Sequence, residues 1–256
     1  MNEGILQIAK RIAAGGKNIV FTGAGISTES GIPDYRSDGG IWEKHRPIYY
    51  DEFMSSKEAR IEYWRRKANL YPDLVNAQPN PAHHALVDLY KMGLLEAVIT
   101  QNIDGLHQKA GLPDERVIEL HGNSQRVRCT RCGKLSPLDD AYRRVKAGDL
   151  APECECGGYL KPDTISFGQM MPAEKVRRAV ELSNACDLFL VIGSTLIVHP
   201  AALMPDYAKR HGSFLAIINL SETPYDNVCD VLIRAKAGEV LPAIVEASSV
   251  MKSRSL

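Results

Sequence analysis

The sequence lacks a net charge, long hydrophobic runs and an abundance of aromatic residues. Its 256 residues carry 31 lysines and arginines against 31 aspartates and glutamates, and only 7% are aromatic. A balanced charge gives no overall electrostatic attraction to nucleic acid or to an anionic membrane. The longest apolar run, Leu188 to Ile192, has the length of a strand and is far too short to span a membrane. We therefore predict no direct nucleic-acid partner and no membrane partner.

No stretch near the N-terminus has the form of a secretory signal, which predicts a cytoplasmic protein, or a nuclear one in a eukaryote. In such a reducing compartment, the six cysteines are expected to be metal ligands or free thiols rather than disulfides. A hydrophobic content of 45% with 24% charged residues is that of an ordinary globular protein. The length suits one large domain, or one large and one small.

A glycine-rich turn follows the first predicted strand. Residues 18–22 form an apolar run of β-forming type, and Gly23 to Gly25 come directly after it. Glycine lets a ligand approach the main chain, and a helix that begins here would offer free N–H groups to a pyrophosphate. The dinucleotide fingerprint, however, has a third glycine where this chain has Thr28. A tight turn without a ligand is the alternative. The early break at residues 31–33, followed by a polar and aromatic loop, favours a lid over a ligand.

Four of the six cysteines form two closely spaced pairs. They are Cys129 with Cys132, and Cys154 with Cys156. Such pairs predict a structural zinc site of four thiolates, which leaves no open coordination position for catalysis; free thiols are the alternative. The second pair has only one intervening residue, so its turn must differ in geometry from the first. The polar stretch around the pairs has little core of its own, so a metal would hold it together.

Strands and helices alternate along the rest of the chain. Apolar runs predict strands at residues 18–22, 94–100, 117–120, 186–192, 214–218 and 231–233. Apolar residues at helical spacing predict helices at residues 5–14, 57–71 (ended by Pro72), from 81 onward, 176–182 and 237–250. This alternation predicts an α/β fold with a doubly wound, parallel, Rossmann-like sheet and a second, smaller zinc-binding domain. We place the Rossmann-like domain at residues 1–122 and 162–256, with a lid and helical insertion at about 31–78, and the zinc module at 123–161.

Polar and small residues follow the predicted strands at Gln101 to Asp104, His121-Gly122, Gly193 to Thr195 and Asn219. Open α/β sheets bind their ligands at the carboxyl ends of the strands, so these residues are expected to line one site. A lone histidine is more often structural, and we expect that of His83 and His84. His121, at a strand exit beside glycine, is instead a candidate general base.

Five stretches together resemble the sirtuin family of NAD-dependent protein deacylases. In order, they are Gly23 to Arg36, Gln101 to Asp104, Leu120 to Gly122, Cys129 to Cys156 and Gly193 to Leu196. The resemblance covers nearly the whole chain. It implies removal of acyl groups, acetyl above all, from protein lysine side chains, with release of nicotinamide, deacylated lysine and O-acyl-ADP-ribose. It also implies NAD as a consumed co-substrate, one structural zinc ion, and acyl-lysine proteins or peptides as partners. We expect a monomer.

The resemblance also implies roles for individual residues. Catalysis would fall to His121 as general base, with Asn102 and Asp104. NAD would be bound by Gly23, Ala24, Gly25, Thr28, Tyr35, Arg36, Gln101, Asn102, Ile103, Asp104, Gly193, Ser194, Thr195, Asn219, Leu220 and Ala237. The substrate peptide would add a strand along Ile165, Ser166, Phe167, Gly168 and Val198.

Tyr63 and Arg66 form a further candidate pair, three residues apart on one face of a predicted helix. In sirtuins that prefer succinyl and other acidic acyl groups, such a pair binds the distal carboxylate, and a guanidinium suits that task. An ordinary amphipathic helix with exposed arginines is the simpler interpretation.

Two other functions remain open. Mono-ADP-ribosyl transfer would use the same cleavage of NAD with a protein nucleophile in place of the acyl oxygen. A non-enzymatic module that senses NAD or zinc is the second. Such a module would not need a base, so the presence of Asn102, Asp104 and His121 together disfavours it.

Overall fold

The computed structural model of the chain describes residues 2–34 and 46–253. Its larger part is a parallel sheet of six strands in the order β3-β2-β1-β7-β8-β9. The strands are β1 (Asn18–Thr22), β2 (Ala97–Thr100), β3 (Val117–Glu119), β7 (Leu188–Ile192), β8 (Phe214–Ile218) and β9 (Val231–Ile233). The order reverses between β1 and β7, which makes the sheet doubly wound and confirms the predicted fold class.

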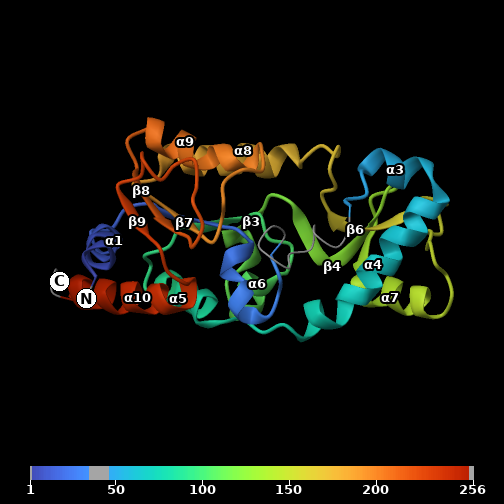
Figure 1. The fold of residues 1–256 in the computed structure, drawn as a ribbon, viewed down its shortest axis with the longest axis horizontal. Helices are drawn as coiled ribbons and strands as arrows, with labels where there is room; N and C mark the ends of the chain where they lie inside the picture. Colours follow the sequence, from blue (N-terminus) through green and yellow to red (C-terminus); the bar gives the residue numbers. More distant parts are fainter. Residues whose placement is uncertain (1, 35–45, 254–256) are drawn as a thin grey trace.

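Helices cover both faces of this sheet (Figure 1). One face carries α1 (Glu3–Ala13), α5 (Pro81–Lys91) and α10 (Ala237–Ser253), and the other carries α8 (Ala173–Ala185) and α9 (Met204–Arg210). Alternate strand residues therefore enter two different cores: Val20 packs with the first set of helices, and Phe21 with the second. Burial on both faces explains why the strands read as unbroken apolar runs in the sequence.

A second, antiparallel sheet of three strands lies at the other end of the molecule (Figure 1). It consists of β4 (Gly122–Cys129), β5 (Leu135–Pro137) and β6 (Leu160–Thr164), in the order β5-β4-β6. Helices α4 (Lys57–Asn76) and α7 (Leu138–Lys146) pack against it, and α3 (Tyr50–Ser55) packs against α4. Trp64 of α4 is buried in this small core and donates a hydrogen bond from Nε1 to the Leu160 carbonyl at 3.0 Å.

Short elements complete the described chain. They are α6 (Leu106–Ala110) and the 3₁₀ turns η1 (Ala24–Ile26), η2 (Thr28–Ser30), η3 (Asp114–Arg116) and η4 (Ala201–Leu203). The residues after the glycine turn thus form two separate 3₁₀ turns. Within the described ranges, no helix is both long and apolar enough to cross a membrane.

Several predicted boundaries were wrong. Strand β7 begins at Leu188 rather than at residue 186, and helix α8 spans Ala173–Ala185 rather than 176–182. Helix α4 does not end before Pro72 but continues through it to Asn76. A proline removes one N–H donor from a helix, yet contacts on either side hold this one: Tyr71 stacks on Tyr142 with ring centroids 3.8 Å apart, and Leu74 packs on the small core. Strand β2 begins at Ala97 rather than at residue 94.

Glycines allow the two halves of the large sheet to meet. A Cβ atom on Gly25 would lie 2.7 Å from Cα of Gly193, and one on Gly193, where φ is +62°, would lie 2.4 Å from the Ile26 nitrogen. The exits of β1 and β7 therefore pack backbone against backbone, and the N–H of Gly25 donates to the Gly193 carbonyl at 2.8 Å.

We predict that Trp64→Phe lowers the free energy of unfolding by about 1–3 kcal/mol, because it leaves the buried Leu160 carbonyl without its donor. Denaturant unfolding measures this change. Leu70→Ala, at a partly exposed position of the same helix, is the matched control and should change stability by less. Equal effects of the two substitutions would contradict the role given to the indole hydrogen bond.

Candidate active site and metal centre

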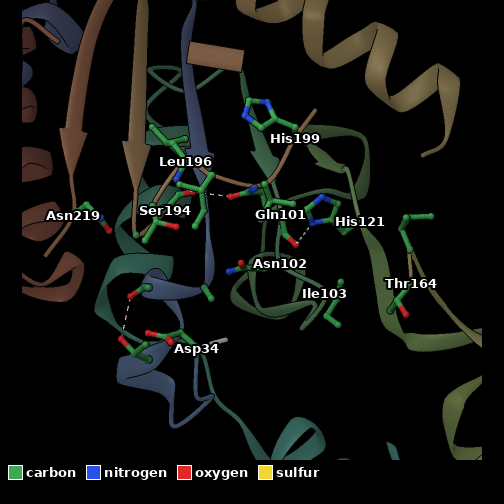
Figure 2. Close-up of a pocket in the computed structure, with 18 of the residues that line it drawn as sticks. Asp34, Gln101, Asn102, Ile103, His121, Thr164, Ser194, Leu196, His199 and Asn219 are labelled. Atoms are coloured by element: carbon green, nitrogen blue, oxygen red, sulfur yellow. Dashed lines mark hydrogen bonds between the residues drawn. The ribbon is translucent and has the colours of Figure 1, made fainter. Parts of the chain in front are cut away.

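A cavity of about 760 Å³ opens at the carboxyl ends of the parallel strands (Figure 2). Its walls come from both sheets, since Thr164 of β6 and Tyr63 of α4 line it together with the strand exits. Predicted NAD-site residues in its lining are Ala24, Gly25, Thr28, Gln101, Asn102, Ile103, Gly193, Ser194, Thr195, Asn219, Leu220 and Ala237. Predicted catalytic and peptide-site residues in its lining are His121, Ile165, Ser166, Phe167, Gly168, Val198 and Tyr63.

Among the described residues predicted for NAD, catalysis and substrate, three are not part of this lining. Gly23 and Asp104 lie behind the wall, and Arg66 is turned to other partners. Tyr35 and Arg36 lie outside the described residues.

A hydrogen bond at Nδ1 holds the His121 ring. Its Nδ1 lies 3.0 Å from the Gln101 carbonyl oxygen. A carbonyl only accepts hydrogen bonds, so Nδ1 carries the proton and Nε2 keeps its lone pair. Burial lowers the pKa of His121 below its ordinary value of 6.5, although the hydrogen bond to Gln101 opposes this shift. The imidazole is therefore neutral at physiological pH.

A buried hydrogen-bond network fixes the loop after β2. The Asp104 carboxylate accepts from the Ser27 hydroxyl at 2.8 Å and from the Leu106 N–H at 2.9 Å. Asn102 donates from Nδ2 to the Gly23 carbonyl at 3.0 Å and to Ser27 Oγ at 3.2 Å. Burial raises the pKa of Asp104, against the effect of these hydrogen bonds. Asp104 thus holds Asn102 in place through Ser27 and does not itself reach the cavity.

A second bond joins the two halves of the sheet across the cavity floor. The Ser194 hydroxyl donates to Gln101 Oε1 at 2.7 Å and accepts from the Leu196 N–H at 3.2 Å (Figure 2). Through this bond, Gln101 after β2 and Ser194 after β7 orient each other. The peptide-site segment is tied to the candidate base as well, because the Ile165 N–H donates to the His121 carbonyl at 2.9 Å.

One end of the cavity is cationic. Tyr63 and Lys67 line it side by side, with the Lys67 Nζ 5.6 Å from the Tyr63 ring centroid. The Nζ of the buried Lys161 lies 5.7 Å from the same centroid. Burial raises the pKa of Tyr63, but the two ammonium groups, together with hydrogen bonds to Thr164 and Ser166, outweigh this effect and bring the pKa to about 8. Arg66, the predicted partner of Tyr63, instead donates to Glu62 Oε1 at 2.6 Å.

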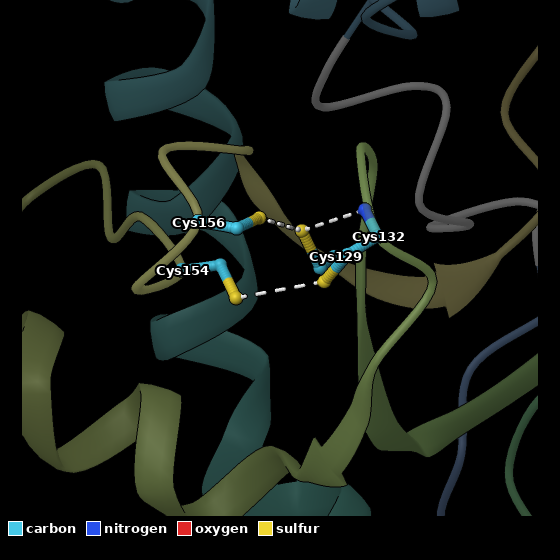
Figure 3. Close-up of side chains that lie close together, drawn as sticks. All are labelled: Cys129, Cys132, Cys154 and Cys156. Atoms are coloured by element: carbon cyan, nitrogen blue, oxygen red, sulfur yellow. Dashed lines mark hydrogen bonds between the residues drawn. The ribbon is translucent and has the colours of Figure 1, made fainter.

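The four predicted zinc ligands lie together (Figure 3). Their sulfur atoms are all within 4.8 Å of one another, with 3.5 Å between Cys129 and Cys156 and 3.9 Å between Cys132 and Cys154. Four thiolates at about 2.3 Å from a tetrahedral Zn²⁺ are about 3.8 Å apart, so the cluster fits this ion. Burial raises the pKa of Cys129, but N–H donors from Cys132 and Arg131 outweigh it and lower the pKa to about 6, which favours the thiolate that zinc needs.

Comparison with known proteins identifies a family with this architecture. The profile of the Sir2 family matches residues 23–200. The chain is 50% identical over 246 residues to NAD-dependent protein deacetylase 1 of Bradyrhizobium diazoefficiens, covering 96% of each chain. This chain belongs to the Sir2 family. NAD-dependent protein deacylase 2 of Pyrobaculum aerophilum is 41% identical over 251 residues, with 94% of each chain covered. A solved complex of Sir2 with a p53 peptide and NAD⁺ superimposes on this Sir2 chain with a TM-score of 0.85 at 35% identity, covering 98% of this chain and 100% of the other.

Membership of the Sir2 family confirms the resemblance seen in the sequence. Two residues that matter to the site were nevertheless missed. Ser27 was absent from the predicted set although it bonds both Asn102 and Asp104. The available signal was a small polar residue two positions after Gly25. Lys67 was missed because the prediction paired Tyr63 with the arginine three residues later, whereas the cation in the cavity wall comes four residues after Tyr63.

We predict that Cys132→Ser in this Sir2 protein lowers the zinc content well below one ion per chain and destabilises the fold. A loss of about 3 kcal/mol would lower Tm by roughly 6–12 °C. Metal analysis and calorimetry on the purified protein measure both quantities. Cys229→Ser, outside the cluster, is the control and should keep the metal. Full zinc content in Cys132→Ser would exclude this thiolate as a ligand.

Proposed function

We propose that the cavity binds NAD and an acyl-lysine side chain together and that His121 is the general base of the reaction. The enzyme carries out NAD-dependent removal of acyl groups from protein lysines, as the names of its Sir2 relatives state for them. The observation that supports this assignment best is the neutral His121 ring, with Nε2 free, in the same cavity wall as Gln101, Asn102 and Ile103.

The reaction begins with loss of nicotinamide. The acyl carbonyl oxygen forms a bond to C1′ of the ribose while the bond to nicotinamide breaks, which gives an O-alkylamidate. A carbonyl oxygen is a weak nucleophile, so much of the rate must come from holding it close to C1′. We assign this task to Asn102 and Ile103, whose loop is fixed by the bonds to Ser27 and Asp104. The enclosing walls keep water from the positively charged carbon.

His121 acts in the second stage. Its Nε2 takes a proton from a ribose hydroxyl, and the hydroxyl oxygen attacks the amidate carbon. Addition of water and release of the lysine amine then leave O-acyl-ADP-ribose. Ser194 and Thr195, with Asn219, Leu220 and Ala237 beyond them, line the far end of the cavity, and we assign them to the adenosine half of NAD.

We propose an acetyl group as the principal acyl group, with acidic acyl groups as a second candidate. The cationic end of the cavity supports the second candidate, because Lys67 and Tyr63 offer donors to a distal carboxylate. The Tyr63–Arg66 pair remains the alternative form of this proposal, and it requires Arg66 to leave Glu62. Hydrogen bonds from Arg65 and Arg66 lower the pKa of Glu62 to about 2.

Four further expectations remain proposals. We propose a monomer that acts in the cytoplasm without direct contact to nucleic acid, and a division into the Rossmann-like residues 1–122 and 162–256 and the zinc module 123–161. Sedimentation, fractionation and limited proteolysis test them. Mono-ADP-ribosyl transfer is distinguished by labelled NAD, since it would leave label on protein rather than on O-acyl-ADP-ribose.

We predict that His121→Ala reduces deacylation of an acetyl-lysine peptide by at least about a hundredfold, because no base remains for the ribose hydroxyl. The wild-type rate should fall as the pH falls through a pKa below 6.5, where the imidazole becomes protonated. Mass spectrometry of the peptide across pH measures both effects. His84→Ala, at an exposed histidine of α5, should retain wild-type turnover. Retained turnover in His121→Ala would remove His121 from this role.

We predict that Lys67→Met lowers kcat/KM for a succinyl-lysine peptide by roughly tenfold to a hundredfold, as expected for a lost hydrogen bond to a charged group. The acetyl-lysine peptide of the same sequence should be affected much less. Arg66→Met is the matched control and should leave the succinyl rate unchanged. A loss of desuccinylation in Arg66→Met alone would instead select the Tyr63–Arg66 pair. No succinyl turnover in the wild type would refute the acidic candidate altogether.

A further inference from the structure

A buried carboxylate lies two residues before His121. Glu119, the last residue of β3, is only 5% exposed. Its side chain accepts hydrogen bonds from four donors on three other elements: Gln108 Nε2 at 2.8 Å, Asn123 Nδ2 at 2.6 Å, Arg126 Nη2 at 2.7 Å and Lys175 Nζ at 3.1 Å. Burial raises the pKa of Glu119, but the hydrogen bonds from Asn123 and Arg126 and the charges of Lys175 and Arg126 outweigh it and hold the pKa below its ordinary value.

One of these bonds spans the candidate base. Asn123 follows His121 by two residues, as Glu119 precedes it by two, so the bond between their side chains closes a loop around His121 and Gly122. Gly122 has a φ of +80° and no room for a side chain, because a Cβ there would lie 1.9 Å from the Asp163 carbonyl oxygen. The main chain that carries His121 is thus held from both ends.

The other bonds anchor that loop to the rest of the molecule. Gln108 belongs to α6, Lys175 to α8 and Arg126 to β4 of the second sheet. Arg126 also donates from Nε to Asp163 on β6 at 2.6 Å, so the chain of ion pairs runs from the large sheet into the small one. None of these groups lines the large cavity apart from His121 itself.

We propose that Glu119 is a positioning residue for the acyl-transfer step, and that its carboxylate sets the placement of the His121 imidazole. This inference rests on the proposed role of His121 as base. His121 acts only after nicotinamide has left, so a displaced imidazole slows acyl transfer and spares the cleavage of NAD. A carboxylate that served stability alone would, when lost, reduce both stages together. The two stages can be measured separately, which makes the roles distinguishable.

The experiment compares Glu119→Gln with the wild-type enzyme on an acetyl-lysine peptide. Formation of O-acyl-ADP-ribose should fall by about tenfold to a hundredfold, as expected for a misplaced catalytic group. Exchange of labelled nicotinamide into NAD, which reports the first stage, should stay within about twofold, and KM for NAD likewise. Asn123→Ala removes one of the four donors to Glu119, together with the acceptor of the Gln125 N–H, and should give the same split with a smaller fall. The test thus survives if Glu119→Gln does not fold.

Two further variants provide the references. Arg128→Gln loses the pairing of a half-exposed arginine with Asp163 but does not touch Glu119, and it should match the wild type in both assays. The inference would be overturned if Glu119→Gln lost exchange and acyl transfer equally, or if it kept wild-type acyl transfer. In either case, an inactive His121→Ala would leave the proposed function standing. Wild-type turnover in His121→Ala would overturn the proposed base and this inference with it.

Discussion

Close packing of Gly25 on Gly193 is the contact from which the geometry of the site follows. It brings the exits of β1 and β7 together where the strand order reverses, with no side chain between them. All strands of the sheet are parallel, so the carboxyl ends of the remaining strands lie at the same edge. The residues after β2, β3 and β8 therefore meet around one cavity, although they are far apart in the sequence. Any side chain at Gly25 or Gly193 would separate these exits.

Buried polar groups then convert this edge into a site with fixed geometry. Asp104 orients Ser27, and Ser27 orients Asn102, so a carboxylate outside the cavity determines what the cavity wall presents. Such groups are costly to bury unless every partner is in place, which is why the network holds one arrangement. The hydrogen bond from His121 to the Gln101 carbonyl has the same effect on the imidazole, because it selects the tautomer.

Features that depend on short-range sequence patterns could be predicted from the sequence. The edges of β1, β8 and β9 were predicted correctly because strands buried on both faces are continuous apolar runs. The spacing of the cysteine pairs was enough to predict that the four thiols form one cluster. The end of α4 was wrong because the rule for proline is local, whereas Tyr71 and Leu74 hold that helix by contacts with a module more than sixty residues later in the chain. The four donors around Glu119 come from three separate elements, and no local pattern reveals such a convergence.

Strand β4 joins the two functional parts of the molecule. It begins at Gly122, next to His121, and ends at the zinc ligand Cys129, eight residues in all. The strand bulges between Asn123 and Val127, so Gly122 and Cys129 pair with Thr164 and Leu160, which are only four residues apart on β6. At about 3.3 Å per residue, the two ends of β4 therefore lie roughly 13 Å apart. Arg126 lies between them and pairs with both Glu119 and Asp163. A four-thiolate zinc ion has no open position for chemistry, yet it fixes one end of the strand whose other end carries the base. With His121 as the proposed base, the metal would affect catalysis through the placement of β4.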